Sequence, residues 1–292
     1  MPRIAYVNGV YVPLAEAAVS IEDRGYQFAD GVYEVAAFLN GRLFDWDEHV
    51  ARLRRSLAAL SIAEPMAPRA FDLVARKLLA RNGAANALLY IQVTRGVARR
   101  DHPFPAAARP SLVMTARPFD YALRARQQQT GIRILTQTEQ RWARCDIKSI
   151  ALLPNILAKQ AARQAGAFEA WMIDADGTVT EGASTNAWLI AANGALVTHP
   201  LGHKILGGVM RSTLIRLARD AGYRIDERPF TLTEAGNAAE AFITSTSAPC
   251  IGVVAIDGRP VGIGTPGPVT LCLGQLLWDE IERQTGYRPA SG

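Results

Sequence analysis

The sequence predicts a two-domain protein of the α+β or α/β class, with a small N-terminal domain and a larger C-terminal domain. Its 292 residues exceed one typical domain but suit two compact ones. Segments of helical and of strand periodicity alternate along the chain, and hydrophobic residues make up 49% of it, which is ordinary for a globular protein. We expect the domains at residues 1–118 and 130–292, with a connection at 119–129.

The first half has the pattern of strands, two helices and further strands. Asn8-Gly9 and Asn40-Gly41 each separate two strand-like segments, which predicts tight hairpins. Asp45 precedes a helical segment and Glu48 follows three residues later, a spacing that predicts a capping box. The expected strands are 4–7, 10–12, 32–39, 42–44, 87–94 and 111–116, the expected helices are 45–60 and 68–81, and a loop covers 95–110.

The second half contains more strands than the first and three further helices. Asp176-Gly177 and Asn193-Gly194 are the hairpin signals of this part. The expected helices are 152–164, 209–221 and 269–284. The expected strands are 132–137, 170–173, 178–180, 185–190, 195–198, 223–226, 241–244 and 252–256.

Composition argues against several classes of protein. No apolar run approaches the ~18 residues that span a bilayer, and the N-terminus lacks the character of a targeting peptide. The three cysteines are widely spaced, which indicates reduced thiols without a disulfide framework or a metal site. We therefore expect a soluble cytoplasmic protein. A net charge of +5 permits polyanion binding, but the arginines are scattered among acids, which argues against a nucleic-acid site.

Lysine is rare in this chain, and one lysine stands at a junction between expected elements. The lysines are Lys77, Lys148, Lys159 and Lys204, among 32 cationic residues. An amine can lose its proton and condense with a carbonyl, whereas arginine effectively never does. Lys148 follows an alternating segment and precedes an expected helix, a position that suits the edge of a cleft. From spacing alone, the alternative is a solvated lysine at the end of an element.

Two motifs of the second half place glycine beside a residue that could bind a ligand. Glu181 follows a hairpin, and the neighbouring Gly182 allows close approach of another group, although such a glutamate is usually solvated. Gly207-Gly208 leads into the expected helix at Val209, where free backbone N–H groups can hold a phosphate. The alternative is a flexible turn before an ordinary helix.

The first half offers an aromatic and a cationic candidate. Tyr33 lies in an expected strand, where its hydroxyl could donate to a carboxylate, although strand tyrosines more often belong to the core. Arg100 and His102 lie two residues apart in the loop 95–110, which Pro103 stiffens. Together they could bind a carboxylate through charge-assisted hydrogen bonds, or they could simply be solvated.

The run Arg-Cys-Asp-Ile-Lys-Ser around Lys148, with Leu-Leu-Pro-Asn and Ala-Lys-Gln behind it, resembles the lysine segment of fold-type IV aminotransferases that use pyridoxal phosphate. The resemblance covers nearly the whole chain, and its Arg-x-His loop makes the chain most similar to D-amino acid aminotransferases. It implies the two-domain fold of that family, pyridoxal 5'-phosphate as cofactor and a homodimer. The other matching motifs are Thr-Glu-Gly-Ala-Ser-Thr-Asn at 180–186, Leu-Gly-Gly-Val-Met-Arg at 206–211 and Asp-Arg-Gly-Tyr-Gln-Phe-Ala-Asp-Gly-Val-Tyr-Glu-Val at 23–35.

The resemblance also implies roles for the matching residues. Lys148 forms the internal Schiff base and later shuttles the proton, and Glu181 is the partner of the ring nitrogen. Arg52, which could otherwise be a surface arginine of a helix, matches the phosphate arginine of the family. Arg100 and His102 bind the substrate carboxylate from across a dimer interface. The remaining matches contact the cofactor (Leu206, Val209, Met210 and Thr246) or the substrate (Tyr33 and Ser245).

Three positions depart from the usual residues of this family. The family often has phenylalanine or tyrosine at Trp188, serine at Ala183 and threonine at Met210. The last departure removes a possible side-chain bond to the phosphate.

The expected reaction is transamination from a D-amino acid such as D-alanine to 2-oxoglutarate, which gives pyruvate and D-glutamate. Enzymes of the same fold that act on branched-chain L-amino acids or (R)-amines are alternatives, but they need no carboxylate clamp at Arg100 and His102. Aminodeoxychorismate lyase, which shares the lysine and the glutamate, is a third alternative. A non-enzymatic polyanion-binding protein is a fourth.

Overall fold

The computed structural model describes residues 3–289, and the chain divides into two compact units. The first unit comprises the described residues up to Asp120 together with Ile147–Ala151. The second comprises Tyr121–Asp146 and the described residues from Leu152 onward. The mixed helix and strand content confirms the expected class, whereas the limits 1–118, 119–129 and 130–292 stay predictions. The sequence did not indicate that the segment around Lys148 belongs to the first unit.

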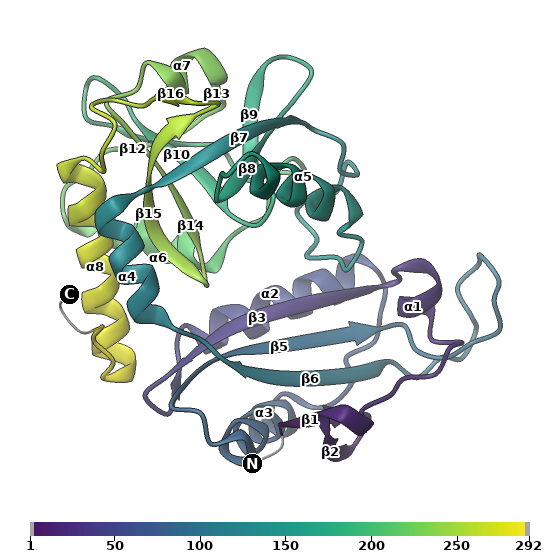
Figure 1. Ribbon diagram of the computed structural model, residues 1–292. Helices are drawn as coiled ribbons and strands as arrows, with labels where there is room; N and C mark the ends of the chain where they lie inside the picture. Colours follow the sequence, from purple (N-terminus) through teal and green to yellow (C-terminus); the bar gives the residue numbers. More distant parts are fainter. Residues whose placement is uncertain (1–2, 290–292) are drawn as a thin grey trace. The chain divides into compact units, whose positions relative to one another are not determined.

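An antiparallel six-stranded sheet forms the frame of the first unit, in the order β2-β1-β6-β5-β3-β4. Its long strands β3, β5 and β6 lie side by side in Figure 1. Both predicted hairpin turns are confirmed, with positive φ at Asn8, Gly9, Asn40 and Gly41. The strands are β1 (Ile4–Val7), β2 (Val10–Pro13), β3 (Gly31–Leu39), β4 (Arg42–Leu43), β5 (Asn86–Thr94) and β6 (Ser111–Pro118).

The helices of the first unit are α1 (Arg24–Phe28), α2 (Trp46–Ala59) and α3 (Pro68–Asn82), with a short 3-10 turn at Leu14–Glu16. Helices α2 and α3 share one apolar core with the sheet. The ring of Trp46 stacks on that of Phe71, with 5.9 Å between centroids, which joins the two helices. Gly83 ends α3 in the left-handed conformation that glycine commonly adopts after a helix.

The capping box expected at Asp45 is wrong. Asp45 does precede α2, but its φ is 47° and its side chain makes no capping hydrogen bond to the helix. An N-cap side chain reaches the first amides from an extended backbone. The left-handed backbone of Asp45 does not provide that geometry, although the spacing to Glu48 is the usual one.

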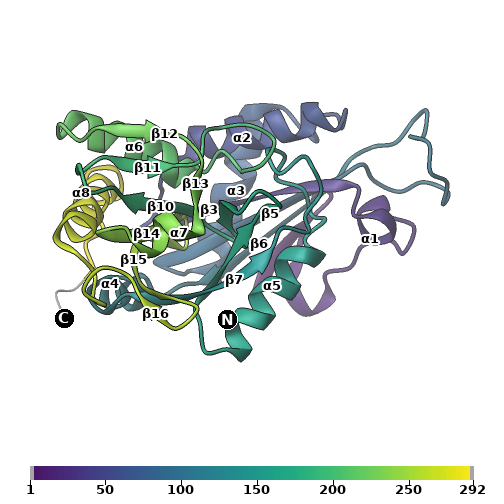
Figure 2. The same cartoon turned by 90° about the horizontal axis from the view of Figure 1, so that it is seen from above.

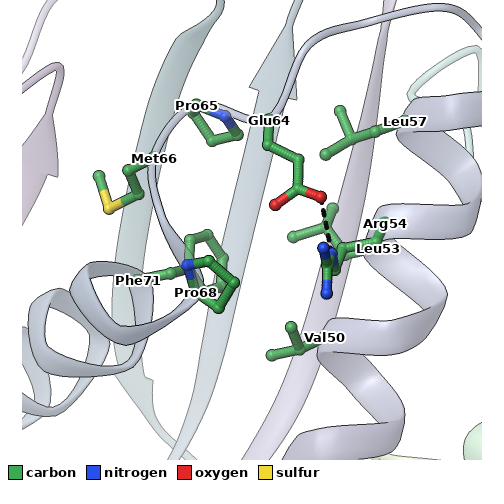
Figure 3. Close-up of a pocket in the computed structure, with 9 residues that line it drawn as sticks. All are labelled: Val50, Leu53, Arg54, Leu57, Glu64, Pro65, Met66, Pro68 and Phe71. Carbon is green, nitrogen blue, oxygen red and sulfur yellow. Dashed lines mark hydrogen bonds and ion pairs between the residues drawn. The ribbon is translucent and has the colours of Figure 1, made fainter.

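An apolar pocket lies between α2 and α3 (Figure 3). Its lining includes Val50, Leu53 and Leu57 from α2 and Phe71 from α3. Arg54 and Glu64 form an ion pair of 2.7 Å beside it. The pocket is lined by none of the residues assigned to chemistry from the sequence.

A mixed ten-stranded sheet forms the frame of the second unit, in the order β12-β11-β10-β14-β15-β7-β8-β9-β13, with β16 paired to β15. Strand β7 pairs in parallel with both β15 and β8. None of the helices in the described part of the chain combines the length and apolar character that a membrane span requires. The strands are β7 (Ile132–Thr138), β8 (Glu169–Ile173), β9 (Thr178–Gly182), β10 (Asn186–Ile190), β11 (Leu196–Thr198), β12 (Ile225–Glu227), β13 (Phe230–Thr231), β14 (Glu240–Ser245), β15 (Ala248–Ile256) and β16 (Arg259–Pro260).

Most of the stretch expected as a connection at 119–129 is helical. The helices of the second unit are α4 (Tyr121–Thr130), α5 (Leu153–Gln164), α6 (Val209–Asp220), α7 (Leu232–Gly236) and α8 (Pro268–Thr285). Figures 1 and 2 both show α4 beside α8. Trp278 Nε1 donates to Gln128 Oε1 at 2.8 Å, and the Tyr121 ring meets the Trp278 ring edge-on. Contacts with a helix about 150 residues away therefore stabilise α4.

Candidate functional site

The backbone around Lys148 is fixed against strand β3 and helix α2 of its unit. Ser149 forms an antiparallel bridge with Val32 at the start of β3. The Tyr33 amide donates to the Lys148 carbonyl at 3.0 Å, and the Lys148 amide donates to Ser56 Oγ at 3.2 Å. Lys148 is half-buried, and its Nζ lies 4.2 Å from the centroid of the Tyr33 ring. The structure thus brings two of the candidate residues together.

Arg52 is buried in the first unit, where it pairs with Glu34 of β3. Its Nε and Nη2 donate to the two carboxylate oxygens of Glu34 at 2.9 and 2.5 Å. His49 Nδ1 lies 3.0 Å from Glu34 Oε1. Burial raises the pKa of Glu34, but the Arg52 and His49 contacts outweigh burial and hold this pKa below its usual range. Because Arg52 is only 5% exposed, its alternative role as a surface arginine is wrong.

Glu181 presents a buried carboxylate in the second unit, with donors on both oxygens. Its Oε1 accepts from Arg141 Nη1 at 2.5 Å. Its Oε2 accepts from the Leu206 amide at 3.1 Å and from Asn186 Nδ2 at 3.0 Å. Burial raises the pKa of Glu181, and the charge and hydrogen bond of Arg141 oppose this increase. Glu181 and Leu206, both named from the sequence, are therefore in direct contact.

Gly208 forms a glycine cradle before α6, where the backbone passes close to Asn186. A Cβ on Gly208 would lie 2.0 Å from Asn186 Oδ1, so this position requires glycine. Asn186 Nδ2 also donates to the Leu206 carbonyl at 2.9 Å, which fixes the chain just before the helix. Among the residues that the structure describes, no side chain caps α6. Its first-turn amides, those of Val209 and Met210, carry the partial positive charge of a helix start.

Ser245 and Thr246 lie where β14 turns into β15. Ser245 Oγ is 3.5 Å from Ser247 Oγ, and the Thr246 carbonyl accepts from the Tyr121 hydroxyl at 3.4 Å. The departure from the family at Trp188 lies near this turn. Its buried ring donates through Nε1 to Thr244 Oγ1 at 3.0 Å, so a polar partner satisfies the larger aromatic side chain.

Arg100 and His102 are exposed residues of the loop 95–110 in the first unit. This loop lies beside α1 (Figure 1). The Arg100 guanidinium lies 4.5 Å from the centroid of the Phe28 ring. The His102 ring lies 5.7 Å from the same ring, centroid to centroid. The two candidate carboxylate ligands are therefore gathered around one aromatic side chain.

Sequence reasoning missed the partners of several candidates. Arg141, which binds Glu181, opens the lysine segment, and Asn186 closes the glutamate motif, but neither was given a role. Glu34, which binds Arg52, directly follows Tyr33. The signal available for all three was that each lies within a recognised motif. Spacing could not pair Glu34 with Arg52 or Arg141 with Glu181, because these partners lie 18 and 40 residues apart in the sequence. Asn186 and Glu181 belong to the same short motif.

Comparisons with known proteins agree on one family. The family model for amino-transferase class IV matches residues 31–256. A D-alanine aminotransferase of Bacillus licheniformis is 42% identical over 278 residues, which are 95% of this chain and 97% of that protein. A D-alanine aminotransferase of Staphylococcus aureus (strain MSSA476) is 38% identical over 270 residues, 91% of this chain and 93% of that protein.

Solved structures show the same architecture. A T.th. branched-chain amino acid aminotransferase with pyridoxamine 5'-phosphate has a TM-score of 0.87 at 27% identity, covering 99% of this chain and 96% of that one. A branched-chain amino acid aminotransferase of Escherichia coli has a TM-score of 0.90 at 23% identity, covering 100% and 97%. The predicted fold-type IV architecture is thereby confirmed. With a matching family model over most of its length and relatives of about 40% identity, the chain belongs to the class IV aminotransferases.

Proposed function

We propose that the protein is a pyridoxal-phosphate-dependent D-amino acid aminotransferase. It moves the amino group of a D-amino acid such as D-alanine to a 2-oxo acid such as 2-oxoglutarate, which yields pyruvate and D-glutamate. The relatives named D-alanine aminotransferase support this substrate class, because they match nearly the whole chain at 38% to 42% identity. One structural observation carries the proposal: Arg100 and His102 belong to one loop, and both contact the ring of Phe28 on α1.

The residues present fit pyridoxal phosphate in two respects. The glycine cradle before α6 leaves first-turn amides for a phosphate, which helix N-termini bind well. The carboxylate oxygens of Glu181 keep acceptor capacity beyond the three donors that they already have. We assign the phosphate to Val209, Met210, Thr246 and Arg52, the ring to Leu206 and the ring nitrogen to Glu181.

Bound pyridoxal phosphate supplies a ring that withdraws electrons from the α-carbon of the substrate. Lys148 Nζ removes the proton from that carbon as a positioned general base. The Tyr33 ring, 4.2 Å away, restricts the positions open to Nζ. Arg141 favours the ionised form of Glu181, so that its carboxylate can hold a proton on the ring nitrogen.

Substrate handedness follows from where the carboxylate is held. We assign the α-carboxylate to Arg100 and His102, with Tyr33 and Ser245 as further polar contacts. With the carboxylate fixed, a D-amino acid turns its α-hydrogen toward Lys148, whereas the L-enantiomer turns its side chain there. The branched-chain alternative is favoured only by the names of solved structures at 23% to 27% identity. If the protein were a branched-chain L-amino acid aminotransferase, its kcat/KM would be higher for L-leucine than for D-alanine.

The Arg100→Ala variant should have a much higher KM for D-alanine and D-glutamate. A hydrogen bond to a charged group contributes about 1.5–3 kcal/mol, which corresponds to an increase in KM of roughly 10- to 100-fold. A carboxylate-free (R)-amine should be affected far less. Steady-state kinetics on wild type, Arg100→Ala and the neighbouring control Arg99→Ala measure this. A normal KM for D-alanine in Arg100→Ala would show that Arg100 does not bind the substrate carboxylate.

We also propose a homodimer in which Arg100 and His102 of one copy serve the site of the other. Both residues are exposed in the single chain, and so are the apolar side chains of Val97 and Phe104 in the same loop, at 48% and 61%. Exposed apolar groups of this kind often mark an interface. In a hybrid dimer of Lys148→Ala and Arg100→Ala chains, one of the two sites then has both residues intact.

The same kinetic assay tests this sharing of sites. Co-refolded Lys148→Ala and Arg100→Ala chains should turn over low concentrations of D-alanine faster than the sum of the two separate variants. Activity no higher than that sum would contradict the shared site. It would mean that each site takes Lys148 and Arg100 from the same copy, or that the protein is a monomer.

A cytoplasmic location is the remaining part of the proposal. Cys145, Cys250 and Cys272 are free thiols in the structure, which is typical of a reducing compartment. Recovery with the cytosolic fraction of lysed cells supports this location, and recovery from the periplasm or the medium contradicts it.

A further inference from the structure

The loop 95–110 is called the clamp loop. Residues of helix α1 contact both the backbone and the side chains of this loop. Arg24, which is 3% exposed, donates through Nη1 to the Asp101 carbonyl at 2.6 Å and through Nη2 to the His102 carbonyl at 3.4 Å. A buried guanidinium thus binds the two carbonyls that directly follow Arg100. One rigid, planar group with several donors fixes the course of an otherwise exposed loop.

Asp30 and Arg95 fix Arg24 in turn. The Asp30 carboxylate accepts from Arg24 Nε at 2.8 Å and from Arg95 Nε and Nη2 at 2.8 and 3.0 Å. Arg95, at the start of the clamp loop, also donates to the carbonyls of Leu60 and Ser61. Burial raises the pKa of Asp30, but the hydrogen bonds from Arg95 and Arg24 outweigh it and leave the pKa below its usual value. Asp30 therefore stays ionised and holds both guanidinium groups in place.

Phe28, one turn after Arg24 on α1, contacts the side chains of the clamp. The guanidinium groups of Arg24 and Arg100 lie 4.8 and 4.5 Å from its ring centroid. The His102 ring lies 5.7 Å away and is tilted by 48°. Cations bind aromatic faces, which holds Arg100 on the Phe28 ring, and the His102 ring packs on the same side chain. The Phe28 ring therefore sets where Arg100 and His102 lie relative to each other.

We propose that Arg24 and Phe28 are positioning residues that make the site selective for substrates with an α-carboxylate. Arg24 fixes the backbone between the two clamp residues, and Phe28 fixes their side chains. The inference rests on the proposed function, because it assumes that Arg100 and His102 bind the carboxylate. Neither Arg24 nor Phe28 contacts substrate in this account, and both act through the clamp loop.

Conservative variants of the holoenzyme test the inference. Arg24→Lys keeps the charge beside Asp30 but cannot reach both carbonyls, and Phe28→Leu keeps an apolar side chain without an aromatic face. Each should raise KM for D-alanine about 10-fold or more, since a small displacement of a positioning group has large effects. We expect kcat within about twofold of wild type, because the loss concerns binding, and an unchanged KM for an (R)-amine. Arg76→Lys, in an exposed pair with Asp72, is the matched control.

A double-mutant cycle separates positioning from a general effect on the fold. If Arg24 acts through the clamp, Arg24→Lys should raise KM by a clearly smaller factor once Arg100 is alanine, because only His102 then remains to be positioned. An equal effect in both backgrounds would overturn the inference, and so would an unchanged KM in Arg24→Lys with an active wild type. If Arg24→Lys has a lower Tm than Arg76→Lys, its effect on KM could come from a destabilised fold. The double-mutant cycle is then run with Phe28→Leu in place of Arg24→Lys, and its result decides whether the inference holds. Failure of wild type to transaminate D-alanine is a separate result, which refutes the proposed function.

Discussion

The Lys148→Ala variant is expected to fold normally and to lose transamination. Loss of a positioned general base alone typically lowers a rate by ~10²–10⁴, and the variant also lacks the amine that we assign to binding the cofactor. The fold should survive, because the hydrogen bonds of this segment use the backbone amide and carbonyl of Lys148, not its side chain. The measurements are kcat with D-alanine and 2-oxoglutarate, and Tm by circular dichroism.

Lys77→Ala is a matched control for this variant. Lys77 is exposed in the same unit, and its Nζ also lies over a tyrosine ring, 5.5 Å from the centroid of Tyr11. It should keep wild-type turnover. Near-normal kcat in a correctly folded Lys148→Ala protein would show that another group performs the proton transfer.

The Glu181→Gln variant should bind cofactor but remove the α-proton much more slowly. A neutral amide cannot hold a proton on the ring nitrogen, so the developing negative charge is poorly stabilised. Loss of one such electrostatic contact typically costs ~10²–10³ in rate. Stopped-flow absorbance after mixing with D-alanine measures this half-reaction, and the absorption of the bound cofactor should change as well.

The control for Glu181→Gln is another buried carboxylate of the same unit. Glu240 accepts from the amides of Val269 and Thr270 at the start of α8, at 3.0 and 2.7 Å. Glu240→Gln should lower stability and leave the rate of α-proton removal unchanged in the folded protein. If Glu181→Gln reacts as fast as wild type, a different acid binds the ring.

Local signals in the sequence were sufficient for much of the fold. Helix α3 was predicted at 68–81 and runs Pro68–Asn82, because proline starts it and Gly83 ends it. Hairpin turns followed from asparagine-glycine pairs in the same way. Helix α4 was missed because its polar residues show no clear apolar stripe, and its packing on Trp278 joins distant parts of the chain. The capping box failed because Asp45 has a left-handed backbone, with φ of 47°, from which its side chain does not cap the helix.

The same distinction applies to the candidate site. Lys148 and Glu181 stand in motifs of several consecutive residues, so a resemblance could identify them. Arg24 contacts the clamp loop across 77 residues of sequence, and Arg52 meets Glu34 across 18. Pairs of this kind depend on the register of β3 with β5 and on the placement of α2, which no local pattern specifies. Roles that depend on them emerged only from the structure.

The central claim is that this protein transaminates D-amino acids through Lys148. The most direct measurement is the absorbance of the bound cofactor after purified holoenzyme is mixed with D-alanine or, separately, with L-alanine, without any acceptor. The account predicts rapid conversion of the cofactor to its aminated form with D-alanine, formation of one pyruvate per site, and little change with L-alanine. Preferential conversion by L-alanine, or no spectral change with either enantiomer, would contradict it.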